Sequence, residues 1–348
     1  FLITIMVSHV FAGAGRTGAQ ILELGGGTRA EALGEAFSAV SGDVTSIFWN
    51  PGGLANVEEI QTTLAYTDYS DIFGEASEGL YYALFAGAIP FSEYGAFGAT
   101  LQVQGQGVID VTTDSPEVIR QENLGTNWVL ALSYADSISK NLYAGMTGKV
   151  IHQVLGDYGG NAYAVDFGAQ YNLNLLPIPI TFGTAIQNMG TRIKFKDEEQ
   201  SDPLPRKCKI GTSWSFIDTE YHKFRIVADL TAAIDKLKED DEEGIKLYLE
   251  EHPDVTREEL EADRGVGINA FRWRNMTKSV GAEYWFGSIL ALRVGYKEEP
   301  GIVLQDFADH LTYGLGLRIM NYQVDYAATP GGGPDNKSLH RLALLLRF

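Results

Sequence analysis

The sequence predicts an all-β protein: a transmembrane antiparallel β-barrel of about 14 strands with a small N-terminal helical hatch in its lumen. From about residue 59 onward, the chain divides into segments of roughly ten residues in which one parity is apolar and the other small or polar, as in membrane strands. Short and long connections alternate between these segments. No stretch approaches the roughly 18 consecutive apolar residues that a spanning helix needs, which excludes a helical membrane protein.

The composition supports strands and limits the partners. The 39 glycines, 17 tyrosines and 17 phenylalanines favour strands and tight turns over long helices. The net charge of -18 gives no electrostatic attraction to phosphate backbones, so we expect no nucleic-acid partner. The single cysteine, Cys208, excludes an internal disulfide framework, and strand alternation turns it toward lipid.

The first element, residues 1–12, is a short apolar run that ends in small residues. We expect it to be the remnant of a signal peptide, which would place the mature chain outside the cytoplasm. An ordinary buried strand or helix is the alternative, because short apolar runs are ambiguous.

The second element, residues 13–57, is expected to form the hatch. It does not alternate, and small residues recur at helical spacing between Thr28 and Val40. A barrel of about 14 strands leaves interior space that wall side chains alone do not fill, and a folded plug would occupy it. Arg29 and Asp43 are expected to form an ion pair that holds this hatch in the lumen.

The third element, residues 58–348, is expected to be the barrel. Residues 97–104 alternate most clearly, with odd positions facing lipid and Thr100, Gln102 and Gln104 facing the lumen. We expect strands near residues 59–69, 78–91, 94–111, 126–136, 139–154, 161–173, 178–188, 206–217, 222–233, 278–286, 289–297, 309–319, 321–328 and 338–348.

The connections assign the two ends of this barrel. Long loops are expected at residues 70–77, 112–125, 155–160, 189–205, 234–277, 298–308 and 329–337, with short turns between them. Membrane barrels have short periplasmic turns and longer external loops. The longest loop, 234–277, is acidic, and Thr256 and Glu259 have the spacing of a capping box, so we expect a partly helical extracellular excursion.

The last predicted strand keeps its apolar parity up to Phe348. A barrel closes only when its final strand pairs with its first. The terminal aromatic residue also resembles the insertion signal that outer-membrane assembly machinery reads. A simple hydrophobic end is the alternative interpretation of Phe348.

Catalytic, cofactor and metal sites have little support. The six histidines are scattered, and neither a His-Glu-x-x-His motif nor a Gly-x-Ser-x-Gly elbow occurs. Residues 239–250 are a near miss to a calcium loop, for which a solvated acidic helix is the alternative. We therefore expect no enzyme, no cofactor and no metal. The lumen-facing charges are expected to form a structural network between wall and plug, with a transport path as the alternative: Lys149, Arg225, Asp229, Arg293, Arg318 and Asp325.

Residues 27–55, above all the run Trp49-Asn50-Pro51-Gly52-Gly53-Leu54-Ala55, closely resemble the N-terminal signature of the PorV/PorQ family. Similarity continues at residues 280–286, 292–296, 312–317 and 324–327. We assign the hatch motif to Arg29, Asp43, Trp49, Asn50, Pro51 and Gly52. Gly53 stands where many relatives have alanine, and the acidic insertion at 234–262 is not a hallmark of the family.

The resemblance implies a FadL-like β-barrel with an internal hatch in a Gram-negative outer membrane, surrounded by lipid and lipopolysaccharide. It also implies an accessory or shuttle role in type IX secretion, with secreted cargo bound through C-terminal signal domains and a large translocon barrel as partner. The alternative is a FadL-like passive transporter of hydrophobic small molecules, with a lipid or hydrophobic ligand bound in the lumen. A purely structural outer-membrane protein is the third hypothesis. The interior residues assigned from parity are mostly Gly, Thr, Gln and charged, which favours the secretion role over an apolar conduit.

Overall fold

A computed structural model describes residues 17–69, 79–91, 95–112, 118–156, 158–174, 177–195, 201–234, 246, 249, 253, 255–264, 270–300, 307–330 and 338–348. The predicted signal-peptide remnant at residues 1–12 lies outside the described residues, as does most of the calcium-like segment 239–250.

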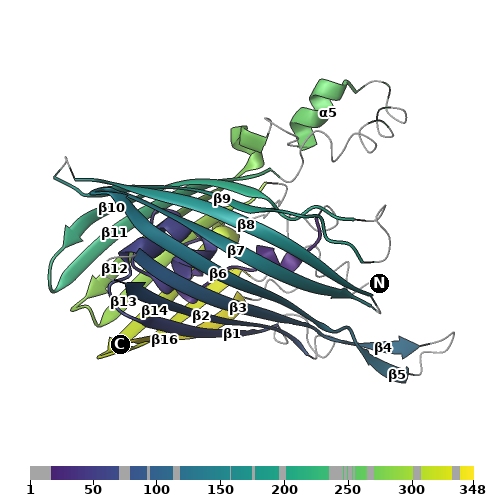
Figure 1. The fold of residues 1–348 in the computed structure, drawn as a ribbon, viewed down its shortest axis with the longest axis horizontal. Coiled ribbons are helices and arrows are strands. Elements are labelled where there is room, and N and C mark those ends of the chain that lie inside the picture. The colour runs from purple at the N-terminus through teal and green to yellow at the C-terminus, as the bar shows by residue number, and fades with distance from the viewer. Residues whose placement is uncertain are drawn as a thin grey trace.

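The wall is a closed antiparallel barrel of 14 strands within the described part of the chain, as the alternation predicted (Figure 1). Each strand pairs with its neighbours along the chain, except that β3 pairs with β6 across an inserted hairpin, and β1 pairs with β16 to close the barrel. The strands are β1 (Gln61–Asp68), β2 (Leu80–Phe91), β3 (Gly95–Gln106), β6 (Thr126–Ser139), β7 (Leu142–Leu155), β8 (Tyr158–Leu173), β9 (Ile180–Gly190), β10 (Lys207–Asp218), β11 (His222–Ala233), β12 (Met276–Phe286), β13 (Leu290–Glu298), β14 (Leu311–Ile319), β15 (Tyr322–Pro330) and β16 (Ser338–Arg347).

The inserted hairpin corrects the expectation of one strand over 94–111 and a loop over 112–125. The barrel strand β3 ends at Gln106, and Gly107 follows with a φ of 87°, a left-handed conformation that glycine adopts readily. The chain then forms β4 (Val108–Thr112), which pairs with β5 (Val118–Asn123) in a separate two-stranded sheet that projects beyond the barrel (Figure 1). Alternation continues through this point, so periodicity could not show the change of pairing partner.

The connection between β7 and β8 is a second correction. A long loop was expected at 155–160, but the two strands extend until Leu155 pairs with Tyr158. Gly156 lies in this tight turn with a φ of 58°. The order of short and long links therefore fails here, because β7 and β8 stay paired up to a tight turn that contains a glycine.

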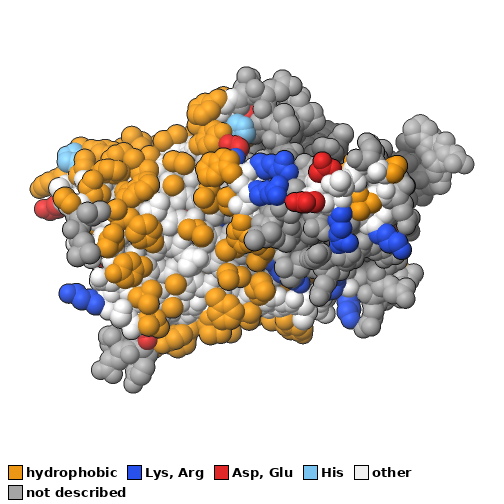
Figure 2. All heavy atoms as spheres, turned by 90° about the horizontal axis from the view of Figure 1, so that it is seen from above, with side chains coloured by type: hydrophobic (Ala, Val, Ile, Leu, Met, Phe, Trp, Pro, Cys, Tyr) orange, Lys and Arg blue, Asp and Glu red, His pale blue; other side chains and the backbone are white. Residues whose placement is uncertain are grey.

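The outer surface carries the apolar parity of the strands. On β3, Phe97 and Leu101 are 48% and 41% exposed, whereas Thr100 is 2% exposed. Figure 2 shows hydrophobic side chains spread over one half of the visible face of the molecule. Cys208 shares the outward parity of Ile210, as predicted.

Residues 17–57 lie inside the barrel as a compact, mostly irregular segment, here called the hatch (Figure 1). It contains the short helices η1 (Gln20–Glu23), α2 (Thr28–Glu31), η2 (Val44–Phe48) and η3 (Pro51–Asn56). Helix η3 packs against β6, β7 and β8, and α2 packs against β14 and β15 on the other side of the lumen. The predicted hatch is thus present over these residues.

Three further helices are described at the end with the long connections: α5 (Arg257–Arg264), η8 (Trp273–Asn275) and η9 (Phe307–His310). The predicted capping box starts α5, because the Glu259 carboxylate accepts from the Thr256 amide at 3.0 Å and the Glu259 amide donates to Thr256 Oγ1 at 3.3 Å. Among the described helices, none has the length and apolar character needed to cross a membrane.

Candidate functional site

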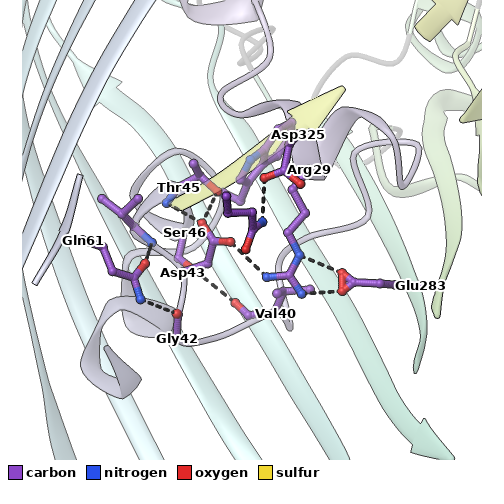
Figure 3. Close-up of polar contacts among 12 residues, drawn as sticks. Arg29, Val40, Gly42, Asp43, Thr45, Ser46, Gln61, Glu283 and Asp325 are labelled. Atoms are coloured by element: carbon purple, nitrogen blue, oxygen red, sulfur yellow. Dashed lines mark hydrogen bonds and ion pairs between the residues drawn. The ribbon is translucent and has the colours of Figure 1, made fainter. Parts of the chain in front are cut away.

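The hatch is tied to the wall by a fork of hydrogen bonds from Arg29 (Figure 3). Its Nε and Nη2 atoms donate to the two carboxylate oxygens of Glu283 on β12, each at 2.7 Å. Its Nη1 atom donates to Asp43 Oδ2 at 2.9 Å, so the predicted ion pair is present. One guanidinium therefore bridges two hatch segments and a barrel strand, in the planar geometry that favours bidentate carboxylate pairing.

The sequence reasoning missed Glu283, although its parity carried a signal. Ser279, Gly281, Glu283 and Trp285 are all buried on β12, so an alternating count places this carboxylate in the lumen. No local pattern, however, links residue 283 to residue 29, which are 254 positions apart.

The Arg29 fork continues into the wall as a chain of alternating charges. Arg293 on β13 lies 3.5 Å from Glu283 and donates to Asp325 on β15 at 2.6 Å. Gln323 Nε2 donates to the second Asp325 oxygen at 2.7 Å, and Trp285 Nε1 donates to Glu283 at 2.9 Å. Each buried charge in this chain has an opposite partner, as desolvated ions require, although Arg293 Nη2 has no hydrogen-bond partner among the described residues.

Asp43 also organises the hatch itself. Its Oδ1 atom accepts from the Thr45 amide at 2.8 Å and from the Thr45 hydroxyl at 2.6 Å, which caps η2. Burial alone would raise the pKa of Asp43, but Arg29 and the Thr45 hydrogen bonds outweigh burial and hold that pKa below its ordinary value. Gln61 on β1 clamps the same turn, accepting from the Val44 amide and donating to the Gly42 carbonyl, both at 3.0 Å (Figure 3).

Asn50 is the centre of the Trp49-Asn50-Pro51-Gly52 motif. Its side chain is fully buried, and Oδ1 accepts from the Gly52 amide at 3.0 Å, which caps η3 with Pro51 in the first turn. Its Nδ2 atom donates to the hatch carbonyl of Ser38 at 2.7 Å and to the wall carbonyl of Ala169 at 2.9 Å. One side chain thus joins two hatch segments and β8.

The other two motif residues pack and orient the hatch. Trp49 Nε1 donates to the Gly26 carbonyl at 2.7 Å, and its ring lies 6.5 Å from the Phe37 ring. The Lys209 ammonium of β10 lies 4.6 Å from the Trp49 ring centroid, a cation–π contact. At Gly52, an added Cβ would lie 3.0 Å from Ala169 Cα, which explains why a glycine follows the proline.

The hatch backbone lies close to the wall because the wall there is made of glycine. An added Cβ at Gly183 would lie 2.1 Å from the Ser38 carbonyl oxygen, and one at Gly295 would lie 2.1 Å from the Gly34 amide nitrogen. On strands β9 to β14, an added Cβ would meet hatch atoms at five inward-facing glycines: Gly183, Gly211, Gly281, Gly295 and Gly314. We call them the glycine seat.

The predicted lumenal charge network is divided into separate groups. Lys149 pairs with Asp166 at 2.7 Å on β7 and β8, apart from the Arg293–Asp325 pair. Within the described part of the chain, Asp229 forms no ion pair with a lumenal cation; its Oδ2 atom accepts from the Phe37 amide, the Ser38 amide and the Ser38 hydroxyl. This carboxylate therefore seats the hatch backbone, a role that residue type alone could not indicate.

The remaining predicted wall cations lie near the same network. Arg318 donates to Gln323 from two nitrogens, at 3.0 and 2.9 Å, and its guanidinium lies 4.7 Å from the Trp285 ring. Arg225 is half-buried on β11, directly across from Glu283 in the strand register.

The lumen is less polar than its predicted composition. On one side, buried apolar residues of β2, β6 and β7 pack against Ile21 of the hatch, including Leu84, Val129 and Ile151. The expectation of an interior of Gly, Thr, Gln and charges therefore holds for β9 to β16 but is wrong for this side. Strand β2 is apolar on both parities, so alternation gave no sign of which face turned inward.

Phe348 closes the barrel seam through its backbone. Its amide donates to the Ile60 carbonyl at 2.9 Å, and its carbonyl accepts from the Ile60 amide at 3.2 Å, just beyond the β1–β16 pairing. The ring is 67% exposed.

A closed 14-strand barrel with an apolar outer band and a lumenal hatch is a β-barrel protein of the Gram-negative outer membrane. Residues 14–237, well over half of the chain, match the model of the family described as type IX secretion system protein PorV. The chain therefore belongs to the PorV family, which confirms the resemblance of its N-terminal motif.

The chain is also similar to solved outer-membrane structures. The toluene transporter TodX of Pseudomonas putida aligns with 10% identity and a TM-score of 0.47, over 91% of this chain and 96% of TodX. A FadL homologue from Pseudomonas aeruginosa aligns with 13% identity and a TM-score of 0.45, over 93% and 98% of the two chains. The monoaromatic hydrocarbon channel CymD aligns with 12% identity and a TM-score of 0.46, over 93% and 98%. No curated protein sequence matches this chain.

Proposed function

We propose that this protein is a type IX secretion accessory that binds the C-terminal signal domains of secreted cargo, and the translocon, through its extracellular loops and rim. Membership of the PorV family supports the pathway. The observation that supports the mode of action is the hatch, which occupies the lumen and is bonded to strands from β7 round to β14 and to β16 and β1.

These bonds make passage of a protein through the barrel costly. Releasing the hatch would break the Arg29–Glu283 fork, the Asp229 contacts and the Asn50 contacts together. A buried hydrogen bond contributes about 1 kcal/mol net, and buried groups left without a partner add to that cost. A barrel plugged in this way acts on large partners through its surface.

Two described features project from the extracellular end and extend that surface. The β4–β5 hairpin pairs with itself and stands beyond the barrel, and α5 stands beyond the opposite side of the same end (Figure 1). A protein partner can contact either projection without entering the lumen.

The experiment is affinity purification of the tagged full chain from outer membranes in mild detergent, followed by mass spectrometry of co-purifying proteins and extracted lipids. We expect a very large barrel and proteins that share a C-terminal sorting domain. Recovery of the chain alone with a stoichiometric fatty acid or other hydrophobe would overturn the proposal.

Two matched variants locate the contact. The first lacks residues 236–260, and the second replaces the hairpin residues 108–123 by a short turn; both keep the barrel strands and the hatch. If the acidic connection is the contact, the first variant loses partner recovery and the second keeps it. Full recovery of partners with the first variant would exclude that connection as the docking element.

Passive transport of hydrophobic small molecules is the second candidate function. The apolar side of the lumen, with Leu84, Val129 and Ile151 facing Ile21, is the observation that favours it. The lipid fraction of the same purification tests it, because a transporter should carry a bound hydrophobe whose recovery falls when this apolar side is made polar.

A further inference from the structure

The periplasmic end of the lumen carries two guanidinium groups that share one neutral acceptor. Arg318 on β14 donates to Gln323 Oε1 from Nε at 3.0 Å and from Nη2 at 2.9 Å. Arg347 on β16 donates to the same oxygen from Nη1 at 2.9 Å. Because three N–H groups converge on one atom, the two cations lie side by side, and an amide oxygen carries no charge that would offset their repulsion.

The ion pairs near these groups leave Arg318 without a negative partner. Arg347 Nε lies 3.1 Å from Oε1 of Glu59, whose side chain is 47% exposed. In the part of the chain that the structure describes, the polar and ring contacts of Arg318 are with Gln323 and Trp285, neither of which is charged. A half-buried guanidinium without a carboxylate partner is an open position for an anion.

The carboxylates deeper in the lumen are already bound. Asp325 accepts from Arg293 Nη1 at 2.6 Å with one oxygen and from Gln323 Nε2 at 2.7 Å with the other. Glu283 accepts both bonds of the Arg29 fork. Neither carboxylate can neutralise a further cation without giving up a buried bond that it now makes.

Both arginines lie at the end of the lumen that opens to the periplasm. Arg347 is the last residue of β16, and Arg318 lies close to the short β14–β15 turn. Figure 1 places the C-terminus at this end of the barrel, opposite α5 and the β4–β5 hairpin. Gly314, where an added Cβ would meet Ala32 of the hatch, lies deeper on β14. A ligand therefore reaches the arginines from the periplasm and meets the hatch beyond them.

Met320, at the tip of the β14–β15 turn, adds an apolar contact close to Arg318. Its side chain is 86% exposed, and its φ of 54° is a left-handed conformation, which is unfavourable for a residue with a Cβ. Two-residue hairpin turns prefer Asn, Asp or Gly at such a position. The methionine thus holds a flexible apolar side chain out from the end of the barrel, where a protein partner can cover it.

We propose that four residues, here called the mouth patch, bind an acidic segment of a periplasmic protein: Arg318, Met320, Gln323 and Arg347. A carboxylate of the segment accepts from both guanidinium groups, whose planar forks suit it, and so offsets their repulsion. An apolar side chain of the segment packs on Met320. The hatch closes the lumen beyond the patch, so the segment docks there and does not pass through.

This contact is separate from the proposed cargo contact. It lies on the periplasmic side, whereas the cargo contact lies at the extracellular loops and rim, so either can fail without the other. The chain as a whole has a net charge of -18 and repels acidic segments. Docking at the mouth patch therefore depends on the local charge of its two arginines.

The test measures the binding of synthetic probes to the full chain in nanodiscs of zwitterionic lipid. The first probe is a short peptide, capped at both ends, that carries adjacent aspartates beside a leucine. The second has asparagines in place of the aspartates, and citrate and inorganic phosphate serve as small anions.

The variants are Arg318→Gln, Arg347→Gln and Met320→Gly. The matched control is Lys140→Gln, which removes an exposed cation from the β6–β7 turn at the same end of the barrel. Glycine adopts a left-handed conformation readily, so Met320→Gly should fold at least as well as the parent. Heat-modifiable migration in SDS gels verifies that each barrel is folded.

We expect each arginine variant to bind the aspartate peptide about tenfold more weakly, the factor that one charge-assisted hydrogen bond contributes. Met320→Gly should weaken both peptides, because it removes the apolar contact, and the control should bind within about twofold of the parent. No measurable binding of the aspartate peptide, equal affinity for the two peptides, or an equal loss in the control would each overturn the proposal. Citrate or phosphate binding as tightly as the aspartate peptide would also overturn it, because the patch would then be a site for free anions.

Discussion

Replacing Arg29 with alanine should release the hatch while leaving the barrel closed. The substitution removes two 2.7 Å bonds to Glu283 and one 2.9 Å bond to Asp43, whose side chains are only 3% and 5% exposed. Breaking a buried ion pair on one side costs about 3–5 kcal/mol. Glu283 keeps Arg293 at 3.5 Å and the Trp285 indole at 2.9 Å, so we expect the lower end, about 3 kcal/mol.

This cost should appear as local opening, because the bonds of the wall strands remain. About 3 kcal/mol corresponds to a population of open hatch roughly 100-fold larger. Hydrogen exchange measured by mass spectrometry on peptides covering residues 26–50 should therefore accelerate by that factor, and single-channel conductance in planar bilayers should show open events that the parent lacks.

Two controls separate the hatch lock from a general loss of charge. Arg29→Lys keeps the charge but loses the fork, so its exchange should lie between parent and alanine variant. Arg318→Ala removes a wall cation whose contacts are Gln323 and Trp285, both on barrel strands, and should leave the hatch peptides unchanged. The role of Arg29 in holding the hatch would be refuted if the hatch peptides of Arg29→Ala exchanged within twofold of the parent rate. It would also be refuted if Arg318→Ala raised their exchange rate as much as Arg29→Ala does.

Three further predictions concern the glycine seat, the Trp49–Gly52 motif and helix α5. Gly295→Ala should lower the free energy of unfolding, measured with urea in detergent, by about 1–3 kcal/mol or more, because its Cβ would lie 2.1 Å from the hatch backbone. The control Gly148→Ala, whose Cβ would have nothing within 4 Å, should lower it by less than about 1 kcal/mol. Equal losses would argue against the glycine seat. Asn50→Asp should destabilise the hatch more than Asn50→Ala, since a carboxylate would face two carbonyl oxygens at 2.7 and 2.9 Å; the reverse order in thermal melts would contradict the hydrogen-bond assignment. Thr256→Ala should speed amide exchange in α5 about fivefold by removing the cap. Hydrogen bonds from Thr256 hold the pKa of Glu259 below its ordinary value. The stability that the ionised Glu259 gives to α5 should therefore be fully present above the ordinary pKa and be lost as the pH falls through the lowered pKa. If amide exchange in α5, corrected for intrinsic rates, does not change over this pH range, the capping box is excluded.

The strands could be predicted because a membrane wall imposes one local rule along the whole chain. Apolar parity marks each lipid-facing residue, as with Phe97 and Leu101 on β3, and needs no knowledge of the pairing partner. The β4–β5 hairpin was missed for the same reason. Its alternation is that of a wall strand, and only the turn at Gly107 redirects it.

The hatch contacts could be predicted only where both partners lie close in sequence. Arg29 and Asp43 are 14 positions apart within one plug, so their opposite charges suggested a pair. Glu283 and Asp229 lie 254 and 191 positions from their hatch partners, and the register between plug and wall decides those contacts. The motif from Trp49 to Gly52 was visible as a signature, but its reason, the buried Asn50 that bridges hatch and β8, required the fold.

The position of Arg341 ties the earliest described part of the chain to the last strand. Its Nη1 atom donates to the Gly25 carbonyl at 2.7 Å across 316 positions of sequence, and Nε donates to Thr67 on the first strand. A nascent chain cannot make these bonds until its last strand has been synthesised, so the hatch gains these contacts only when the whole chain is present. A chain that ended before β16 would lack both the β1–β16 seam and the Arg341 contacts, and its β1 and β15 would keep unpaired edges.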